Sequence, residues 1–197
     1  MENTSVERHA WLETGILEFR PLFDKIGYPL SDNIRASIGF TQGGGGRRKA
    51  IGQMWSPTVV TDGIPEMFIS PEVNDGRVVL GVTGHELCHN AVGVECGHRG
   101  PFRKCALAIG LTGKMTATAN GPAMEAFAAD FIKRHGPYPA GRIDYSARKR
   151  QTTRMIKCEC RDCKYVARTT RKFLVQAGAP LCPCNGKAMA SEYIKTV

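Results

Sequence analysis

His85-Glu86-Leu87-Cys88-His89 is the stretch that decides the fold of this 197-residue chain, because it has the pattern H-E-x-x-H. Residues four apart lie on one face of a helix, so the rings of His85 and His89 can bind a single metal ion. Glu86 lies about 100° around the helix from His85, where its carboxylate can take a proton from a metal-bound water without binding the metal. The stretch predicts a zinc hydrolase site. The alternative interpretation is an amphipathic core helix with two hydrogen-bonded histidines.

Two features of the surrounding sequence favour the metal site. The run Arg77–Gly84 before the motif is mainly apolar, and Gly93 stands where a buried helix would end. Three of the chain's five histidines also lie within residues 85–98. This concentration of imidazoles is typical of a metal centre rather than of a core helix.

The third metal ligand is predicted to be His98. A histidine at position 95 would give the metzincin pattern, but this position is Glu95. Gly97 and Gly100 flank His98 and give the backbone the freedom to turn its ring toward the helix. The alternative ligands are Glu95 or Cys96 from the same turn and Glu125 or Asp130 from a later helix.

The composition limits the class of protein. With 42% hydrophobic residues, the chain can bury an ordinary core. It has no run of 18 apolar residues, and its first residues, MENTSVERHAWLE, are acidic and polar, unlike a signal peptide. We therefore expect a cytoplasmic protein that is not secreted and does not bind a membrane.

Five of the eight cysteines lie within residues 158–184 at metal-ligand spacing. The two-residue gap between Cys160 and Cys163 lets both thiolates bind one ion. Cys182 and Cys184 would supply the other two ligands, although their gap is only one residue, and Cys158 is an alternative ligand. So small a unit has almost no core, so a structural zinc would supply its folding energy. The rival interpretation is a redox dithiol.

The positive charge of the chain is concentrated beside these cysteines. Residues 1–141 contain 14 basic and 14 acidic residues, whereas residues 142–172 contain 11 basic and 3 acidic residues, a net charge of +8. Such a segment suits contact with the phosphates of DNA, with Tyr165 and Phe173 available to stack on bases. The candidate phosphate contacts are Arg168, Arg171 and Lys172. The alternative is a basic surface that contacts only solvent.

The order of the predicted elements indicates an α+β fold. A capping box at Thr4–Glu7 opens an N-terminal helix, which Pro21 bends or ends. Short β-like runs predict a small antiparallel sheet, and helices follow the metal motif. The predicted strands are Ile34–Phe40, Ala50–Trp55 and Glu66–Ser70, with a basic hairpin loop at Gly43–Lys49, and the later helices are Pro101–Gly110 and Pro122–His135. The predicted core residues are Val6, Trp11 or Leu12, Ile16, Phe19, Phe102, Leu107, Ile109, Met124, Phe127, Ala128 and Phe131.

The best domain boundary is the breaker-rich stretch His135–Gly141. We therefore expect a metallopeptidase-like domain at residues 1–141. Residues 142–197 would form a basic linker followed by a zinc ribbon.

With HELCH, GHRGPF and the cysteine-rich end in view, the chain resembles the SprT-like family of zinc metallopeptidases, to which the Spartan DNA–protein crosslink proteases belong. IGQMWSP, EMFISPEV and CALAIGLTGKMTAT extend the resemblance to small phage and bacterial members, over residues 30 to 190 approximately. The resemblance implies a zincin-like domain, one catalytic and one structural zinc, and, for a phage protein, a host cytoplasm. It implies His85, His89 and His98 as zinc ligands, Glu86 as catalytic base, and Cys160, Cys163, Cys182 and Cys184 as ribbon ligands. The short Cys182–Cys184 gap and the additional Cys158 depart from the family pattern.

The expected activity is that of a zinc endopeptidase acting on proteins, including proteins associated with DNA. An extended substrate could pair with the sheet edge at Ala50–Trp55, and Tyr138 and Tyr145 are candidate donors to the oxyanion. The alternative function is a nucleic-acid-binding or regulatory zinc protein without catalytic turnover.

Overall fold

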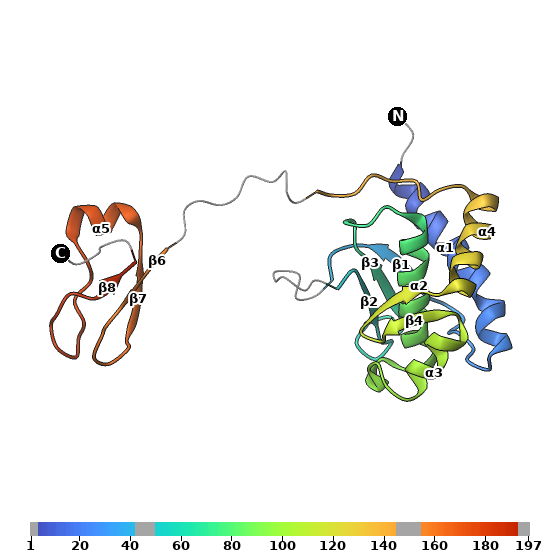
Figure 1. Ribbon diagram of the computed structural model, residues 1–197, viewed down its shortest axis with the longest axis horizontal. Coiled ribbons are helices and arrows are strands. Elements are labelled where there is room, and N and C mark those ends of the chain that lie inside the picture. Colours follow the sequence, from blue (N-terminus) through green and yellow to red (C-terminus); the bar gives the residue numbers. More distant parts are fainter. Residues whose placement is uncertain (1–3, 42–49, 145–154, 193–197) are drawn as a thin grey trace. The chain divides into compact units, whose positions relative to one another are not determined.

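The structure is a computed structural model that describes residues 4–41, 50–144 and 155–192 (Figure 1). The chain divides into two compact units, Met1–Asp144 and Tyr145–Val197. The predicted boundary after residue 141 lies three residues before this division. Both units contain helices and strands, so the predicted α+β class is confirmed.

The first unit opens with a long helix, α1 (Thr4–Lys25), which continues through Pro21 to Lys25. A proline cannot donate to the carbonyl four residues earlier, here that of Leu17. Leu17 and Pro21 are both exposed, so this part of α1 faces solvent, and water is the expected partner of the free carbonyl. Pro21 therefore does not end the helix. The buried residues of α1 are Trp11, Leu12, Ile16, Phe19 and Phe23, and the side chain of Val6 lies outside the described residues.

The three predicted strands form one sheet, but its strand order differs from the expected hairpin. The strands are β1 (Arg35–Ile38), β2 (Gly52–Trp55) and β3 (Glu66–Ile69), in the order β1-β3-β2. β3 pairs antiparallel with β2 and parallel with β1, so the prediction of an antiparallel sheet is wrong for one of the two pairs. The local alternation of apolar residues predicted the strands, but it contains no information on which strands are neighbours. It therefore could not predict that β3 lies between β1 and β2. The predicted basic loop, residues 43–49, lies outside the described residues.

The motif helix α2 (Gly76–Val92) occupies the centre of the first unit (Figure 1). It contacts α1, the sheet and the later elements α3, α4 and β5. The Asp75 side chain caps its first turn by accepting from the amides of Arg77 and Val78, and Gly93 ends it with φ +85°. A 3₁₀ turn, η1 (Val94–Cys96), follows. The fully buried residues that α2 contributes to the core are Val79, Leu80, Leu87 and Cys88.

Two helices and a hairpin complete the first unit. α3 (Pro101–Ala108) and α4 (Pro122–His135) are close to the predicted helices, and between them β4 (Leu111–Lys114) pairs antiparallel with β5 (Ala117–Asn120). This hairpin was not predicted. Of the predicted core residues, Leu107 is wrong, because α3 turns it outward and leaves it 42% exposed. Phe102, Ile109, Met124, Ala128 and Phe131 are buried, and Phe127 packs partly buried against the core.

The second unit is a small sheet with one short helix. β6 (Ile156–Glu159) lies between β7 (Val166–Thr169) and β8 (Ala190–Ser191), and α5 (Arg171–Ala177) follows β7. Among the described residues of this unit, the buried core consists of Cys158, Cys160, Leu174, Cys182 and Met189. Three of the five are cysteines, so hydrophobic burial contributes little to the stability of this unit.

Across the described ranges, none of the helices is both long enough and apolar enough to cross a bilayer.

Candidate metal centres

The side chains of His85, His89 and His98 meet at one point of the first unit. The Nε2 atom of His98 lies 3.1 Å from Nε2 of His85 and 3.2 Å from Nε2 of His89. Three nitrogens bound to one tetrahedral zinc at about 2.0–2.1 Å would lie about 3.3–3.4 Å apart. The observed separations therefore fit a common metal ion, with one coordination position left for a further ligand.

Local backbone geometry explains why these rings converge. His85 and His89 are one helical turn apart on α2. The chain then leaves the helix at Gly93, and Gly97 and Gly100 adopt φ values of +55° and +49° on either side of His98. Non-glycine residues rarely adopt such values. The two glycines thus allow the tight return that brings His98 back to α2.

Phe102, at the start of α3, holds all three imidazoles in place. Its fully buried ring lies 4.9 Å from the ring of His85, 4.4 Å from that of His89 and 4.9 Å from that of His98, between centroids. The sequence predicted Phe102 only as a core residue. It also joins the histidine cluster to the core, so a change of its packing would shift the three rings together.

The β4–β5 hairpin supplies the second contact of His85. Thr118 Oγ lies 3.0 Å from Nδ1 of His85, so Nδ1–H can donate to the hydroxyl and leave Nε2 free for a metal. The matching Nδ1 atom of His89 is buried and has no partner in the part of the chain that the structure describes. Thr118 was missed in the sequence, where only the alternation of Thr112, Thr116 and Thr118 with apolar or small residues hinted at a strand.

Burial keeps the histidines neutral. It lowers the pKa of His85 to about 3 and that of His89 to about 4, with further lowering from the neighbouring imidazoles. The pKa of His98 is also lowered by burial. A neutral imidazole is the form that binds a metal, so the cluster is ready to bind one at neutral pH.

Glu86 lies beside the cluster and belongs to the floor of a groove. Its side chain is buried, and the amide of Met54 on β2 donates to its carboxylate. Gly52 is the reason that β2 can approach so closely, because a Cβ atom there would lie 2.5 Å from both Glu86 Oε1 and Val82 Cγ1. Burial raises the pKa of Glu86 to about 8. A nearby divalent cation would lower it again and favour the carboxylate.

The alternative ligands have other partners. The carboxylate of Glu125 lies 2.8 Å from Arg77, Asp130 pairs with Arg134, and the thiol of Cys96 donates to the carbonyl of Val92. None of these, nor Glu95, belongs to the histidine cluster. The sequence had offered them as rivals to His98, and the structure brings only His98 to the two motif histidines.

Of the two candidate oxyanion donors, the structure describes only Tyr138, which does not lie at the cluster. Tyr138 is buried against Trp11, with ring centroids 5.1 Å apart, and does not line the groove. Its assignment as a donor is therefore wrong, because its ring is part of the hydrophobic core. Tyr145 lies outside the described residues.

A groove of about 950 Å³ opens over the histidines. Its walls are residues 50–54 at β2 and residues 116–120 at β5, and its floor is α2. The edge strand predicted to bind a substrate, Ala50–Trp55, thus borders the cluster. A volume of this size is typical of sites that hold a ligand of several residues or a small molecule.

The second group of side chains that could hold a metal ion is in the second unit and consists of Cys160, Cys163, Cys182 and Cys184. The Sγ–Sγ separations are 3.8 Å for Cys160 and Cys184, 3.5 Å for Cys163 and Cys182, and 3.4 Å for Cys182 and Cys184. Four thiolates at about 2.3 Å from one zinc would lie about 3.8 Å apart. The amides of Cys163 and Asp162 hold the pKa of Cys160 at about 6, which favours its thiolate form.

The two cysteine turns differ in the spacing of their cysteines: Cys163 is three residues after Cys160, whereas Cys184 is two residues after Cys182. The residue after Cys163, Lys164, has φ +63°, and the corresponding residue of the second turn is Gly186, with φ +68°. By this alignment Asn185, not Cys184, occupies the position of the fourth ligand. Cys184 nonetheless completes the cluster, and Asn185 donates to Asp162 at 2.6 Å and lies 3.8 Å from Cys160 Sγ. The alternative ligand, Cys158, points into the core and is not part of the cluster.

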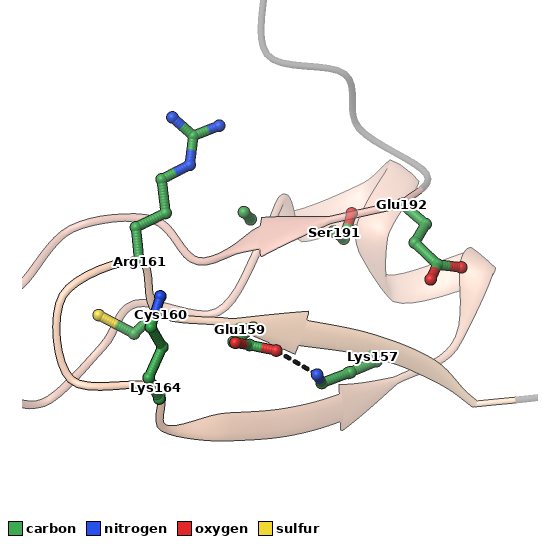
Figure 2. A pocket seen from close by; sticks show the side chains of 8 residues that line it. Lys157, Glu159, Cys160, Arg161, Lys164, Ser191 and Glu192 are labelled. Carbon is green, nitrogen blue, oxygen red and sulfur yellow. Dashed lines mark hydrogen bonds and ion pairs between the residues drawn. The ribbon is translucent and has the colours of Figure 1, made fainter.

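The predicted DNA contacts lie on the exposed surface of the same unit. Arg168, Arg171 and Lys172 are exposed, and the rings of Tyr165 and Phe173 are 52% and 55% exposed. Arg168 is directly opposite Lys157 in the β6–β7 pair, so both side chains lie on one face of the sheet. A shallow pocket on this unit is lined by basic and acidic side chains, and Lys157 pairs with Glu159 there (Figure 2). Its charged residues are Lys157, Arg161, Lys164, Glu159 and Glu192.

Comparison with known proteins does not add a relative: no family model, no curated protein and no solved structure matches the chain.

Proposed function

We propose that the chain is a zinc-dependent endopeptidase of the SprT-like type, with a zincin-like first unit and a zinc ribbon as its second unit. The observation that carries this proposal is the convergence of three neutral imidazoles beside the buried carboxylate of Glu86, under a groove bordered by a strand edge. Three histidines with an open fourth position are the ligand set of a catalytic rather than a structural zinc.

His85, His89 and His98 would hold the catalytic zinc, which when bound supplies Lewis-acid polarisation of the scissile carbonyl. Thr118 and Phe102 hold the imidazoles in position. The Glu86 carboxylate accepts a proton from the attacking water and then donates it to the leaving amine. The edge of β2 orients the peptide by main-chain hydrogen bonds, and the amide of Met54 keeps the Glu86 carboxylate at the groove floor.

The test of this proposal is Glu86→Gln in the full chain. The substitution removes the proton acceptor and leaves the three imidazoles in place, so we expect cleavage of an unfolded protein such as casein to fall by about 10²–10⁴-fold. Zinc content, measured by atomic absorption, stays at the wild-type value. Cleavage at the wild-type rate by a zinc-loaded Glu86→Gln protein would refute the role of Glu86.

The cysteine cluster is proposed to hold a structural zinc. Four thiolates fill the tetrahedral positions and leave none for a substrate, and the five-residue core is too small to support the fold alone. The redox alternative is weaker, because all four sulfurs lie close enough together to bind one ion, instead of forming one isolated pair.

A second candidate function is nucleic-acid binding by the second unit, with or without turnover by the first. It is favoured by the exposure of Tyr165 and Phe173 among basic side chains, of which Lys172 Nζ lies 6.0 Å from the ring centroid of Phe173. Binding to a fluorescent single-stranded oligonucleotide should weaken steeply with salt. Arg168→Glu with Lys172→Glu should lower the salt slope by about 1 for each phosphate that the variant no longer neutralises, whereas the control pair Arg103→Glu with Lys104→Glu on α3 should not. Equal salt slopes for the two double variants would refute nucleic-acid binding through Arg168 and Lys172.

A further inference from the structure

The arrangement of the groove around α2 indicates how a polypeptide would lie in it. At about 100° per residue, and with Gly81 set at zero, His85 lies at about 40°, Val78 at about 60°, His89 at about 80°, Val82 at about 100° and Glu86 at about 140° around the helix. The histidines and Val78 therefore form a middle stripe. Gly81 borders this stripe on one side, and Val82 and Glu86 border it on the other.

Each border of this stripe carries one strand. On the first side, β5 rests on α2: a Cβ atom at Gly81 would lie 2.0 Å from Asn120 Oδ1, and Thr118 reaches His85. On the other side, β2 rests on Val82 and Glu86 through Gly52. The middle stripe thus lies between two strands, where its residues line the groove.

Both strands present to the groove a main-chain edge that pairs with no other described strand, and on β2 the Met54 amide of this edge donates to Glu86. The Ile51 carbonyl accepts from the Ser70 amide toward β3, so the alternation of an antiparallel pair turns the main-chain groups of Gly52 and Met54 to the other edge. The Gly121 amide donates to the Gly110 carbonyl toward β4. By the same rule, the main-chain N–H and C=O groups of Thr118 and Asn120 point away from β4. In the described sheets neither edge pairs with another strand.

One inserted strand is the arrangement that would pair both edges at once. A strand placed between two others holds them about 9.6 Å apart, which is twice the usual spacing of about 4.8 Å. Residues of both parities from each strand line the groove, as expected if the strands face it with their edges.

Val78 is an exposed apolar side chain of the groove away from the histidines, and the charged residues Asp75 and Arg77 line the groove as well. Val78 is 42% exposed, which is unusual for a valine on the innermost helix of a unit. It precedes His85 by seven residues, or about 10.5 Å along the helix. An extended chain covers this distance in about three residues.

We propose that the groove binds an extended, unstructured polypeptide between the edges of β2 and β5, with one apolar side chain of that polypeptide on Val78, about three residues from the histidines. This inference rests on the proposed peptidase function and specifies its substrate class. The carbonyls of Gly52 and Met54 accept alternate amides of the polypeptide on one side, and those of Thr118 and Asn120 accept the remaining amides on the other.

The test uses the full-length, zinc-loaded Glu86→Gln protein and fluorescent peptides built from Gly, Ser and Ala with one leucine at successive positions. Methylation of one peptide nitrogen at a time removes one donor. Between two edges, methylation at every position of the bound stretch should weaken binding by about fivefold. If only alternate positions are sensitive, a single edge pairs and the proposal is refuted. Insensitivity at all positions, or the absence of binding by any peptide, would refute it as well.

The Val78 subsite is tested with Val78→Glu. Glutamate at the third helical residue after the Asp75 cap is a favourable choice, so the helix should be retained. Binding of the leucine peptide should weaken by about tenfold or more, while Leu107→Glu, at an equally exposed site outside the groove, should leave it unchanged. Equal binding by both variants would overturn the subsite. Peptide binding without cleavage by the wild-type protein would refute the peptidase function and leave the groove assignment intact.

Discussion

The histidine and cysteine clusters hold their ligands by opposite means. In the first unit, the histidines are carried by a buried helix and a glycine-flanked turn, and a core that includes four fully buried phenylalanines, Phe19, Phe23, Phe102 and Phe131, surrounds them. In the second unit, two of the four cluster cysteines, Cys160 and Cys182, belong to the small described core, and Cys163 and Cys184 are exposed. We therefore expect the first cluster to be a product of folding and the second to be a condition for it. The same metal would serve chemistry in one unit and architecture in the other.

Removal of metal should have the largest effect, and this effect should differ between the two units. Apparent binding free energies of structural zinc are about 10–16 kcal/mol, so a chelator should unfold residues 155–192. Residues 4–144 keep their hydrophobic core and should remain folded. Limited proteolysis followed by mass spectrometry would show rapid digestion of the second unit and protection of the first. Digestion of both units at one rate would contradict the comparison.

Single ligand substitutions provide the matched control. His98→Ala should lose one of two bound zinc ions and keep the protease resistance of the second unit, and Cys184→Ser should do the reverse. Loss of both ions in either variant would show that the clusters depend on each other.

Phe102→Ala is expected to have the next largest effect, because Phe102 belongs both to the core and to the histidine cluster. Loss of a fully buried phenylalanine costs about 3–5 kcal/mol of unfolding free energy. Phe23→Ala should cost a similar amount, since Phe23 is equally buried and contacts none of the histidine rings. Urea denaturation and a competitive zinc titration would distinguish them. Only Phe102→Ala should weaken zinc binding. Equal zinc affinities for the Phe102→Ala and Phe23→Ala proteins would show that Phe102 contributes to the core but does not position the histidines.

The pH dependence of the metal-free first unit should show two opposite trends. The folded pKa of Glu86, about 8, is above the ordinary value of 4.5, so its contribution is present below pH 4.5 and is lost as pH rises through 8. The folded pKa values of His85 and His89, about 3 and 4, are below 6.5, so their contribution is present above pH 6.5 and is lost as pH falls through 4 and 3. Glu86→Gln should therefore stabilise the chelated protein by about 1–3 kcal/mol at pH 8 relative to pH 5, as measured by urea denaturation. A pH-independent difference would show that Glu86 does not titrate in this range.

Thr118→Val should have the smallest effect. Valine has nearly the same shape as threonine but cannot accept from His85 Nδ1, and such outer contacts change metal affinity by about 10–100-fold. Thr112→Val, on the partner strand β4, keeps the His85 contact and is the control. A competitive zinc titration that gives equal affinities for both variants would show that Thr118 does not orient the ring.

The parts of this structure that were predictable depend on local geometry. The four-residue spacing of His85 and His89 defines a helix face, and the glycines around His98 indicate a turn with unusual φ values. The contact of Thr118 with His85 depends on the position of a hairpin relative to α2, which no short-range pattern determines. The parallel pairing of β1 with β3 was missed for the same reason.

The second unit shows the same limit on a smaller scale. The spacing of Cys160 and Cys163 was sufficient to predict a ligand pair, but it did not distinguish Cys158 from Cys184. That choice follows from the direction in which β6 turns the Cys158 side chain, into the core and away from the other thiols. That Asn185 stands at the position equivalent to Cys163 could not be predicted either. It follows from an alignment of two turns that are far apart in the sequence, and this alignment rests on the φ values of Lys164 and Gly186.

The glycines of α2 have a consequence for the order of events during biosynthesis. A Cβ atom at Gly81 would collide with the Asn120 side chain. A Cβ atom at Gly84 would lie within 3.4 Å of Phe19, Ile109 and Met124. Each glycine lowers the intrinsic stability of a helix by about 1 kcal/mol, so α2 is a poor helix before the later segments dock on it. His85 and His89 would then be aligned only after residues up to α4 have left the ribosome. We expect the first unit to be able to bind a metal ion only after the segments up to α4 have been translated and have docked on α2.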